Sequence, residues 1–350
     1  MNATVARKKN NQNFFSWFGT MWMSRPLFST GIALIVMIVL QTLALGFHFD
    51  SVGAWFTTWL QNWINILRNN AGIGIISLGM TFVIISGGID LAVGSTLVAI
   101  GAVVMMLIDS GPMGILAGWG ITGVPAFIIA ILLGMALGTL LGGFTGVLVT
   151  NGKLPPFIAT LGTMKIFRSV TQHFMQGYTP AVPKSFLNIA SFQIGGQLLM
   201  PIIYWAVLAV ALYIVFTRTT FGRQVIAVGS NERATKLSGV NVNAIKRRIY
   251  ALMGLLVSIA AVIQVSRIGS MDYANAGSGY EMDAISAVIV GGTSMMGGKG
   301  SIVGTVLGAL IIAVMNNLLN LLGVPPFLRE AFKGVIVIGA VLLQKKESNS

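Results

Sequence analysis

Apolar residues in this chain of 350 residues gather into long runs, and short polar segments separate them. A helix that crosses the apolar core of a bilayer needs roughly 20 residues, and most of the runs approach or exceed that length. Their length and periodicity predict about ten membrane-spanning helices. The predicted spans cover residues 29 to 47, 71 to 87, 91 to 108, 124 to 150, 156 to 174, 201 to 217, 249 to 267, 284 to 297, 302 to 322 and 330 to 344. The predicted fold is therefore an all-α polytopic integral membrane protein.

The composition excludes a soluble domain. Hydrophobic residues make up 55% of the chain and charged residues 9%, and the mean hydropathy is +0.83, whereas soluble domains carry about 25% charged residues. The chain has no cysteine and two histidines, which leaves too few ligands for a thiolate or histidine metal centre. Glycine recurs at every fourth position from Gly134 to Gly146, a spacing that lets membrane helices approach closely. We therefore expect tightly packed spans and no metal cofactor.

The net charge of +13 comes from cations in polar segments beside the apolar runs. This distribution predicts insertion topology and not nucleic-acid binding, because cytoplasmic loops of membrane proteins are enriched in lysine and arginine. It places residues 1–28 and 345–350 in the cytoplasm, on either side of a transmembrane domain at 29–344. Both termini are held inside by Arg7, Lys8, Lys9, Arg25, Lys345 and Lys346. Arg68 and Lys184 fall on the outer side as exceptions.

Two segments fit the pattern of simple spans poorly. The run 156 to 174 contains Lys165 and Arg168, so it either packs against protein as a helix or does not fully span. The segment 54 to 67 carries a tryptophan at every fourth position, which is typical of a helix at the outer surface of the membrane. Packing against neighbouring spans explains the tryptophans equally well.

The longest cation-rich segment, residues 218–248, is called the coupling segment below. It carries seven cations against the single carboxylate of Glu232. Its centre has the signals of a helix of about two turns, because Asn231 can cap it, Lys236 suits its carboxyl end and Gly239 can end it. A helix this short needs packing to persist. We therefore interpret the segment as a cytoplasmic docking surface, with candidate residues Gly229, Asn231, Glu232, Arg233, Ala234, Lys236 and Gly239.

Two glycine-rich turns join apolar runs, SGGIDLAVGS at 86 to 95 and GGTSMMGGKGS at 291 to 301. They are candidate hinges, and their echo leaves open whether the chain contains a duplicated unit. A simpler interpretation of Asp90 is a cap on the following helix. The second turn lacks the Ser or Thr of a phosphate-binding loop, so we expect no nucleotide site in this chain. The hinge candidates are Gly87, Gly88, Asp90, Gly291 and Gly292.

A few polar residues interrupt apolar helices. They could line a path for a hydroxylated solute, but amides and hydroxyls also form ordinary hydrogen bonds between membrane helices. The candidates for the path are Asn316, Asn320, Gln264 and Thr81. Glu281 and Asp283, in the outer segment 277 to 283, are candidates for receiving a basic partner, unless this segment is merely a solvated loop.

Four stretches together resemble the permease subunit of a carbohydrate ABC importer of the ribose, galactose and xylose type. They are SGGIDLAVGS, LPPFIATLGTM at 154 to 164, FGRQVIAVGSNERATKLSGVNV at 221 to 242, and GSGYEMDAISAVIVGGTSMMGGKGSIVGTVLGALI at 277 to 311. The first 25 residues and the tryptophan-rich segment lie outside the resemblance.

The resemblance implies the bacterial inner membrane, a second permease copy in a homodimer, a cytoplasmic ABC ATPase and a periplasmic sugar-binding protein. It implies that the ATPase binds ATP, that this chain is not itself an enzyme, and that residues 229–239 form a coupling helix. Alternating access would then move a pentose or hexose, while the identity of the solute is left open. The alternatives are an ion-coupled secondary sugar carrier, for which no clear ionisable residue lies near the bilayer midplane, and an intramembrane enzyme.

Overall fold

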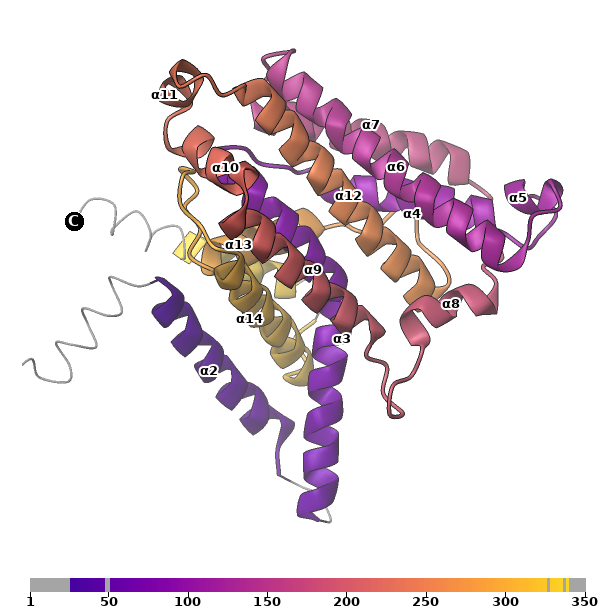
Figure 1. The fold of residues 1–350 in the computed structure, drawn as a ribbon. Coiled ribbons are helices and arrows are strands. Elements are labelled where there is room, and N and C mark those ends of the chain that lie inside the picture. The colour runs from indigo at the N-terminus through magenta and orange to yellow at the C-terminus, as the bar shows by residue number, and fades with distance from the viewer. Residues whose placement is uncertain (1–25, 48–50, 326–327, 336–337, 340–350) are drawn as a thin grey trace, which may run out of the picture.

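The structure is a computed structural model, and it describes residues 26–47, 51–325, 328–335 and 338–339. Most of the predicted terminal segment 1–28 and the tail 345–350, with their basic residues, lie outside the described residues. The described chain is helical, with one isolated bridge between Ile194 and Gln197 (Figure 1). The helices are α2 (Pro26–Leu45), α3 (Val52–Ile85), α4 (Val93–Ile108), α5 (Ile115–Gly118), α6 (Gly123–Thr150), α7 (Pro156–Met175), α8 (Lys184–Ser191), α9 (Met200–Arg218), α10 (Thr220–Ser230), α11 (Glu232–Leu237), α12 (Val242–Ile268), α13 (Tyr280–Val290) and α14 (Ile302–Leu321).

Six helices in the described part of the chain are long and apolar enough to cross a membrane, namely α2, α3, α6, α9, α12 and α14. This confirms the predicted all-α membrane class. The predicted span 91 to 108 is a shorter apolar helix, α4, and the predicted span 156 to 174 is the helix α7, which is less apolar. Part of the predicted span 330 to 344 lies outside the described residues. The count of ten spans stays a prediction.

The sequence pattern predicted that the tryptophan-rich segment forms a helix of its own, and this prediction is wrong. The segment is the first half of α3, which runs without a break through Arg68, Asn69 and Asn70. These polar residues do not end the helix, because none is glycine or proline and the Asn70 side chain bonds back to the Ile66 carbonyl at 2.8 Å. Trp59 donates from Nε1 to Thr42 Oγ1 of α2 at 3.1 Å. The tryptophans therefore pack along a neighbouring span.

The predicted span 284 to 297 is wrong in its bounds. The helix at this place, α13, has 11 residues, so it rises only about 16 Å. It begins after Gly279, which adopts a left-handed conformation, and ends at the Gly291-Gly292 pair. The apolar residues of 284 to 297 therefore do not form one membrane-crossing element.

Close packing between α6 and α12 forms the centre of one group of helices. Gly134, Gly138, Gly142 and Gly146 are all buried. A Cβ atom on Gly142 would collide with the Tyr250 carbonyl of α12, and one on Gly138 would lie 2.6 Å from the Gly254 carbonyl oxygen. The predicted small-residue contact is confirmed, and it brings two helix backbones together where no side chain fits.

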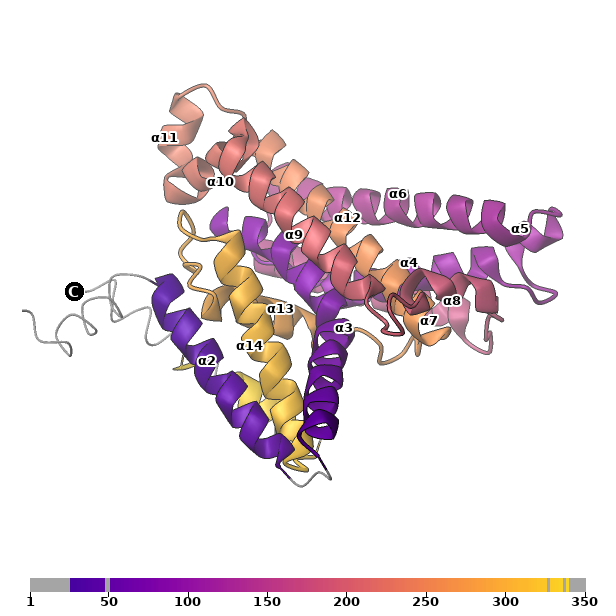
Figure 2. The ribbon, with the colours of Figure 1, turned by 60° about the horizontal axis from the view of Figure 1, so that its bottom comes forward.

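The helices form two groups that share α3. In one group α12 packs against α6 and α4, and in the other α14 packs against α2 and α13. The helix α3 contacts both α12 and α14, and Figure 2 shows α2 and α14 leaning away from α6. Both groups place helix ends near α11, and these ends form the candidate functional site.

Candidate functional site

The coupling segment is helical over most of its length. α9 ends at Arg218, α10 follows at once over Thr220–Ser230, and α11 over Glu232–Leu237 projects at the edge of the molecule (Figure 1). The sequence pattern predicted α11 but missed α10. The signal for α10 was present, because Thr219 precedes the helix and accepts a bond from the Gly222 N–H at 3.4 Å as its cap.

The predicted capping of α11 is confirmed. Asn231 has an extended backbone, and its Oδ1 accepts a hydrogen bond from the Ala234 N–H at 3.0 Å. At the other end, Gly239 has φ +82°, and its N–H donates to the Lys236 carbonyl at 3.1 Å. Free N–H and carbonyl groups at both ends are thereby satisfied within the chain. The six-residue helix is consequently fixed by local hydrogen bonds and not by deep burial.

Most of the α11 surface is exposed. Thr235 is buried and anchors the helix, whereas Glu232, Arg233, Ala234 and Lys236 are exposed. Leu237 is 89% exposed, although burial of a leucine in an apolar environment is worth about 2 kcal/mol. The sequence analysis did not select Leu237. Its only local signal was an isolated leucine within an otherwise polar helix, which does not by itself indicate a partner, because single exposed apolar residues are common on protein surfaces.

Gly229 joins the coupling segment to the rest of the chain. A Cβ atom on Gly229 would collide with the Ile85 carbonyl at the end of α3 and would lie 2.6 Å from the Gly298 N–H nitrogen. The Gly298 N–H itself donates to the Ile85 carbonyl at 2.8 Å. Ile85, Gly229 and Gly298 are called the joint below. The joint puts α10, the end of α3 and the second glycine-rich turn in direct backbone contact.

The two glycine-rich turns end their helices in the same way. After α3, the N–H groups of Gly87 and Gly88 donate to the carbonyls of Ile84 and Val83. After α13, the N–H groups of Gly292 and Thr293 donate in the same way to the carbonyls of Ile289 and Val288. Gly87 and Gly292 supply the left-handed residue with φ +79° and +86°. This geometry is the Schellman motif, which many helices share. It explains the sequence echo without duplication of a larger unit.

Asp90 differs from the prediction in detail. It is buried, but its Oδ1 accepts from the Ala92 N–H at 2.9 Å, before α4 begins at Val93. The cap position of α4 is Ala92, which makes no side-chain cap bond. Asp90 therefore stabilises a turn in the segment between α3 and α4, and it does not cap the helix.

The four candidates for the solute path lie on three helices, and no hydrogen bond joins any two of them in the described chain. Thr81 of α3 is buried and its hydroxyl lies 2.6 Å from that of Thr305 on α14. Gln264 accepts from Arg267, and Asn320 accepts from Arg329 at 2.9 Å. Thr81 thus links two helices, and we assign it no contact with a solute. Asn316 and Asn320 do share a face of α14.

Charged residues at the end of the molecule opposite α11 are buried by loops. Asp109 follows α4, is 3% exposed, and accepts bonds from the Tyr178 hydroxyl and from the N–H groups of Gly111 and Ala181. Burial opposes ionisation of this carboxyl, but the three hydrogen bonds outweigh it, and the pKa of Asp109 is lowered from its usual value. The carboxylate thereby ties two loops together.

Arg168 of α7 also binds a loop. This agrees with the expectation that the segment 156 to 174, which contains a cation, packs against protein. The Arg168 Nη1 donates to the carbonyl oxygens of Ala276 at 2.8 Å and Tyr273 at 3.3 Å. Lys165, on the same helix, is exposed. The loop that Arg168 holds reaches the first turn of α4, where a Cβ atom on Gly94 would collide with the Gly277 carbonyl.

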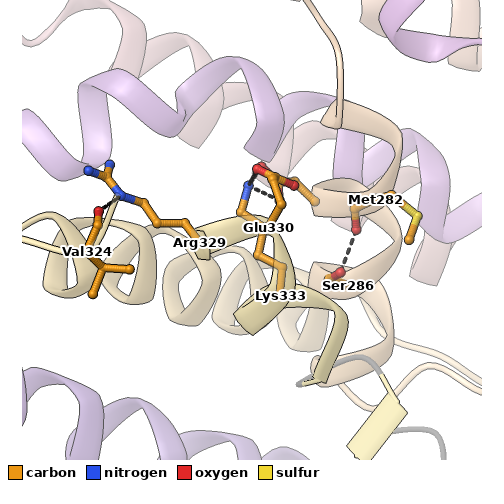
Figure 3. A network of polar contacts seen from close by, with 7 residues as sticks. Met282, Ser286, Val324, Arg329, Glu330 and Lys333 are labelled. Atoms are coloured by element: carbon orange, nitrogen blue, oxygen red, sulfur yellow. Dashed lines mark hydrogen bonds and ion pairs between the residues drawn. The ribbon is translucent and has the colours of Figure 1, made fainter. Parts of the chain in front are cut away.

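Within the predicted acidic docking segment, Asp283 is not open to a partner. Asp283 is buried, and its Oδ1 lies 2.9 Å from Lys333 Nζ, which also contacts Glu330 at 2.8 Å. Figure 3 shows Glu330 and Lys333 on the helical residues 328–335, facing the segment that carries Met282 and Ser286. The partner of Asp283 is therefore a residue of this same chain. Neither the solvated loop nor the open docking surface that the sequence allowed is correct for Asp283.

No group of three or more His, Cys, Asp or Glu residues that could hold a metal ion occurs among the described residues. The arrangement offers exposed helix, backbone joints and buried polar links. These can transmit force and position helices.

Comparison with known proteins identifies the family. Residues 62–341 match the family described as "Branched-chain amino acid transport system / permease component". The ribose import permease protein RbsC of Escherichia coli (strain K12) is 41% identical over 323 residues, which are 90% of this chain and 92% of that protein. RbsC of Bacillus subtilis (strain 168) is 43% identical over 293 residues, which are 82% and 85% of the two chains.

A more distant relative is the xylose transport system permease protein XylH of Escherichia coli (strain K12). It is 32% identical over 375 residues, covering 89% of this chain and 92% of XylH. No solved structure matches the chain. The family match covers the joint and the coupling segment. The chain therefore belongs to this family of transport permeases, and within it to the permeases of carbohydrate ABC importers.

Proposed function

We propose that this permease imports a sugar by alternating between outward-open and inward-open states, driven by ATP hydrolysis on a separate ABC ATPase that docks on α11. A binding energy that differs between the two states must drive the change, because a partner that binds both states equally shifts nothing. The observation that carries the proposal is a rigidly capped six-residue helix whose Leu237 is 89% exposed.

The joint supplies a route from the docking helix to the membrane. A force on α11 reaches α10 through Asn231, whose N–H donates to the Ala227 carbonyl at 3.0 Å. From α10 it passes to α3 and to the turn before α14 through backbone groups in contact at Gly229. Backbone contacts deform little, so they transmit displacement better than flexible side chains would. Gly87, two positions after Ile85, and Gly292, in the same glycine-rich turn as Gly298, are the proposed hinges.

We place α11 and both termini in the cytoplasm of a bacterial cell. Support comes from α2, whose Thr30 donates to the Val290 carbonyl at 3.0 Å, so that the start of α2 lies at the same end as the joint. The exposed cations Arg233, Lys236 and Arg248 also lie at this end, as expected for a cytoplasmic surface. The helix ends at the opposite side would then face the periplasm and a sugar-binding protein.

The proposed solute is a pentose or a hexose; the relatives named for ribose import and for xylose transport support the pentose, since both sugars are pentoses. A homodimer would form the path between two copies, with Asn316 and Asn320 of α14 as candidates for contact with sugar hydroxyls. This chain would hold no cofactor, since ATP would bind to the partner subunit.

The test compares two exposed leucines at opposite ends of the molecule. Leu237→Lys places a charge where we expect an apolar contact, and Leu322→Lys is the control, since Leu322 is also exposed and follows α14 at the other end. The permease, its ABC ATPase and its sugar-binding protein are reconstituted in proteoliposomes. We expect Leu237→Lys to abolish co-purification of the ATPase and ATP-driven ribose uptake, with Leu322→Lys unchanged. Normal association in Leu237→Lys would contradict the docking site.

A separate experiment excludes the ion-coupled carrier. Proteoliposomes that contain this chain alone are given a proton or sodium gradient without ATP. We expect no sugar uptake. Gradient-driven uptake that is indifferent to ATP would overturn the proposal, whatever the result at Leu237.

A further inference from the structure

Two arginines lie together at the end of α12 that is far from α11. A pocket of 290 Å³ is lined by Arg68 of α3 and Arg267 of α12, together with Ala190, Ser191, Leu198 and Ile268. Figure 1 shows α8, which contains Ala190 and Ser191, beside this end of α12. Arg68 is one of the two cations, with Lys184, that the charge pattern left as exceptions on the outer side.

The two guanidinium groups lack an acidic partner within the described chain. The Arg68 Nε is buried and has no hydrogen-bond partner there, and the ion pairs of the described residues involve neither arginine. Arg267 donates to two neutral amide oxygens, Asn69 Oδ1 at 2.7 Å and Gln264 Oε1 at 3.3 Å. Its charge is close enough to that of Arg68 for the two to repel each other. An anion between them would remove both the repulsion and the unsatisfied donor.

The pocket lies where membrane-spanning helices end. α12 ends at Ile268, and α9 begins at Met200, two residues after Leu198. Along α3, Ile85 at the joint lies 17 positions after Arg68, which corresponds to about 26 Å of helix and approaches the thickness of the apolar core of a bilayer. If the joint lies at one surface of the membrane, Arg68 therefore lies near the level of the opposite headgroups.

The pocket has a charged and polar part and an apolar part side by side, as a phospholipid with its phosphate and acyl chains requires. Beside the two arginines and the Ser191 hydroxyl lie the apolar Leu198 and Ile268, and Ile268 is 50% exposed. Guanidinium groups bind phosphate oxygens with paired hydrogen bonds. We propose that Arg68 and Arg267 form a binding site for the phosphate group of a membrane phospholipid, whose glycerol and acyl chains lie toward Leu198 and Ile268.

Binding is measured on the full-length chain in detergent by native mass spectrometry. The probes are a phosphatidylglycerol, a diacylglycerol with the same acyl chains but no phosphate, and inorganic phosphate. We expect the wild-type chain to retain phosphatidylglycerol and not the diacylglycerol. Arg68→Gln removes a charged donor of the site, and we expect it to weaken retention by about tenfold. Lys184→Gln, an exposed cation on α8 outside the pocket, is the matched control and should bind as the wild type does.

A charge reversal separates loss of binding from loss of folding. Arg68→Glu places a carboxylate beside Arg267, so the pair is satisfied without a ligand. We expect this variant to raise the thermal unfolding midpoint in lipid-free detergent and to lose the stabilisation that phosphatidylglycerol gives the wild type.

Three outcomes overturn the proposal. Equal retention of phosphatidylglycerol by the wild type and Arg68→Gln would show that the lipid binds elsewhere. Arginine-dependent binding of inorganic phosphate without binding of the lipid would assign the pocket to a free anion. Unchanged lipid binding in Arg68→Gln, together with lost association with the sugar-binding protein, would assign it to a protein carboxylate.

Discussion

The two ends of this permease treat charge in opposite ways. Near α11 the charged side chains of Glu232, Arg233 and Lys236 are exposed, and the pair between Glu232 and Lys246 lies at the surface. At the opposite end Asp109 is buried and holds two loops together, and within α13 the buried Asp283 likewise holds the segment around Lys333. Exposed charges remain available to a partner, whereas buried charges fix loops because an unpaired buried charge is costly.

The exposed charges near α11 belong to a surface that can bind and release partners. The buried charges belong to a part of the chain whose loops are held in fixed positions, which is called the frame below. The α11 end combines exposed charge with a rigid backbone joint at Gly229, so it can be pushed without unfolding. The opposite end has loops tied by side-chain hydrogen bonds, such as the bond from Tyr178 to Asp109. Substitutions at the two ends should therefore have different consequences.

The largest effect is expected at the joint. Gly229→Val places a side chain against the Ile85 carbonyl, and overpacking against backbone costs about 3 kcal/mol. We expect a lower thermal unfolding midpoint in detergent and no ATP-driven uptake. Gly143→Val on α6 is the control, because a Cβ atom there has no neighbour within 4 Å. A joint that tolerates valine as well as Gly143 does would contradict the close backbone contact.

The next effect is expected at Asp109. Asp109→Ala leaves the Tyr178 hydroxyl and two backbone N–H groups without their acceptor, at a cost of about 2 to 3 kcal/mol. The unfolding midpoint should fall, while the ATPase still co-purifies, because the site lies far from α11. If the ATPase is lost while stability is unchanged, the assignment of Asp109 to the frame is wrong.

Asp109 also predicts a pH dependence. Its pKa in the folded protein lies below its usual value, so its contribution to stability is fully present above the pKa of the unfolded state. The contribution is lost as the pH falls through the lower, folded pKa. The wild type should therefore lose stability in acid more steeply than Asp109→Asn, as measured by unfolding midpoints across the acidic range. Parallel curves would contradict this role.

A smaller effect is expected from the helix caps. Asn231→Ala removes the cap of α11 and Asn241→Ala the equivalent cap of α12, each with a bond of 3.0 Å; each cap is worth about 1 kcal/mol. The helix α12 has 27 residues, so it stays folded without its cap, whereas α11 has only six residues and depends on its cap. We expect only Asn231→Ala to weaken ATPase binding in a co-purification assay. Equal weakening by both variants would remove α11 from its special role.

The smallest effect is expected from the surface pair. Glu232→Gln breaks the 2.7 Å contact with Lys246, but the Glu232 side chain is 55% exposed, and such pairs contribute at most about 1 kcal/mol. Its removal should leave the unfolding midpoint unchanged within error, at low and high salt. A clear loss of stability would show that the ion pair between Glu232 and Lys246 stabilises the fold, as the buried charges do.

Local signals were enough to predict α11. The cap at Asn231 and the left-handed Gly239 act within a few residues, so the sequence carries the complete instruction. The same reasoning predicted the contact face of α6, because glycines four residues apart align on one side of a helix. Leu237 was missed because its exposure depends on what surrounds α11, and an isolated leucine in a polar helix does not by itself show that it is exposed.

Contacts between residues that are distant in sequence could not be predicted from local patterns. The fate of Asp283 depends on Lys333, 50 positions further along the chain. The four candidates for the path share a chemistry but bond to different partners, and only the packing of α3, α12 and α14 could reveal this.

The sequence by itself determined that this protein is a helical membrane protein, because apolar length, glycine spacing and capping residues act through short-range physics, and the resemblance of four stretches to known permeases supplied the family. It also determined where the short helix α11 begins and ends. Only the tertiary structure decided that α3 is continuous, that α13 is half a span, and that Gly229 touches Ile85 and Gly298. It likewise decided that Arg68 and Arg267 share a pocket. These features arise where segments remote in sequence are brought together by packing, and hydrophobic periodicity records which face of a helix is apolar but not which partner covers it.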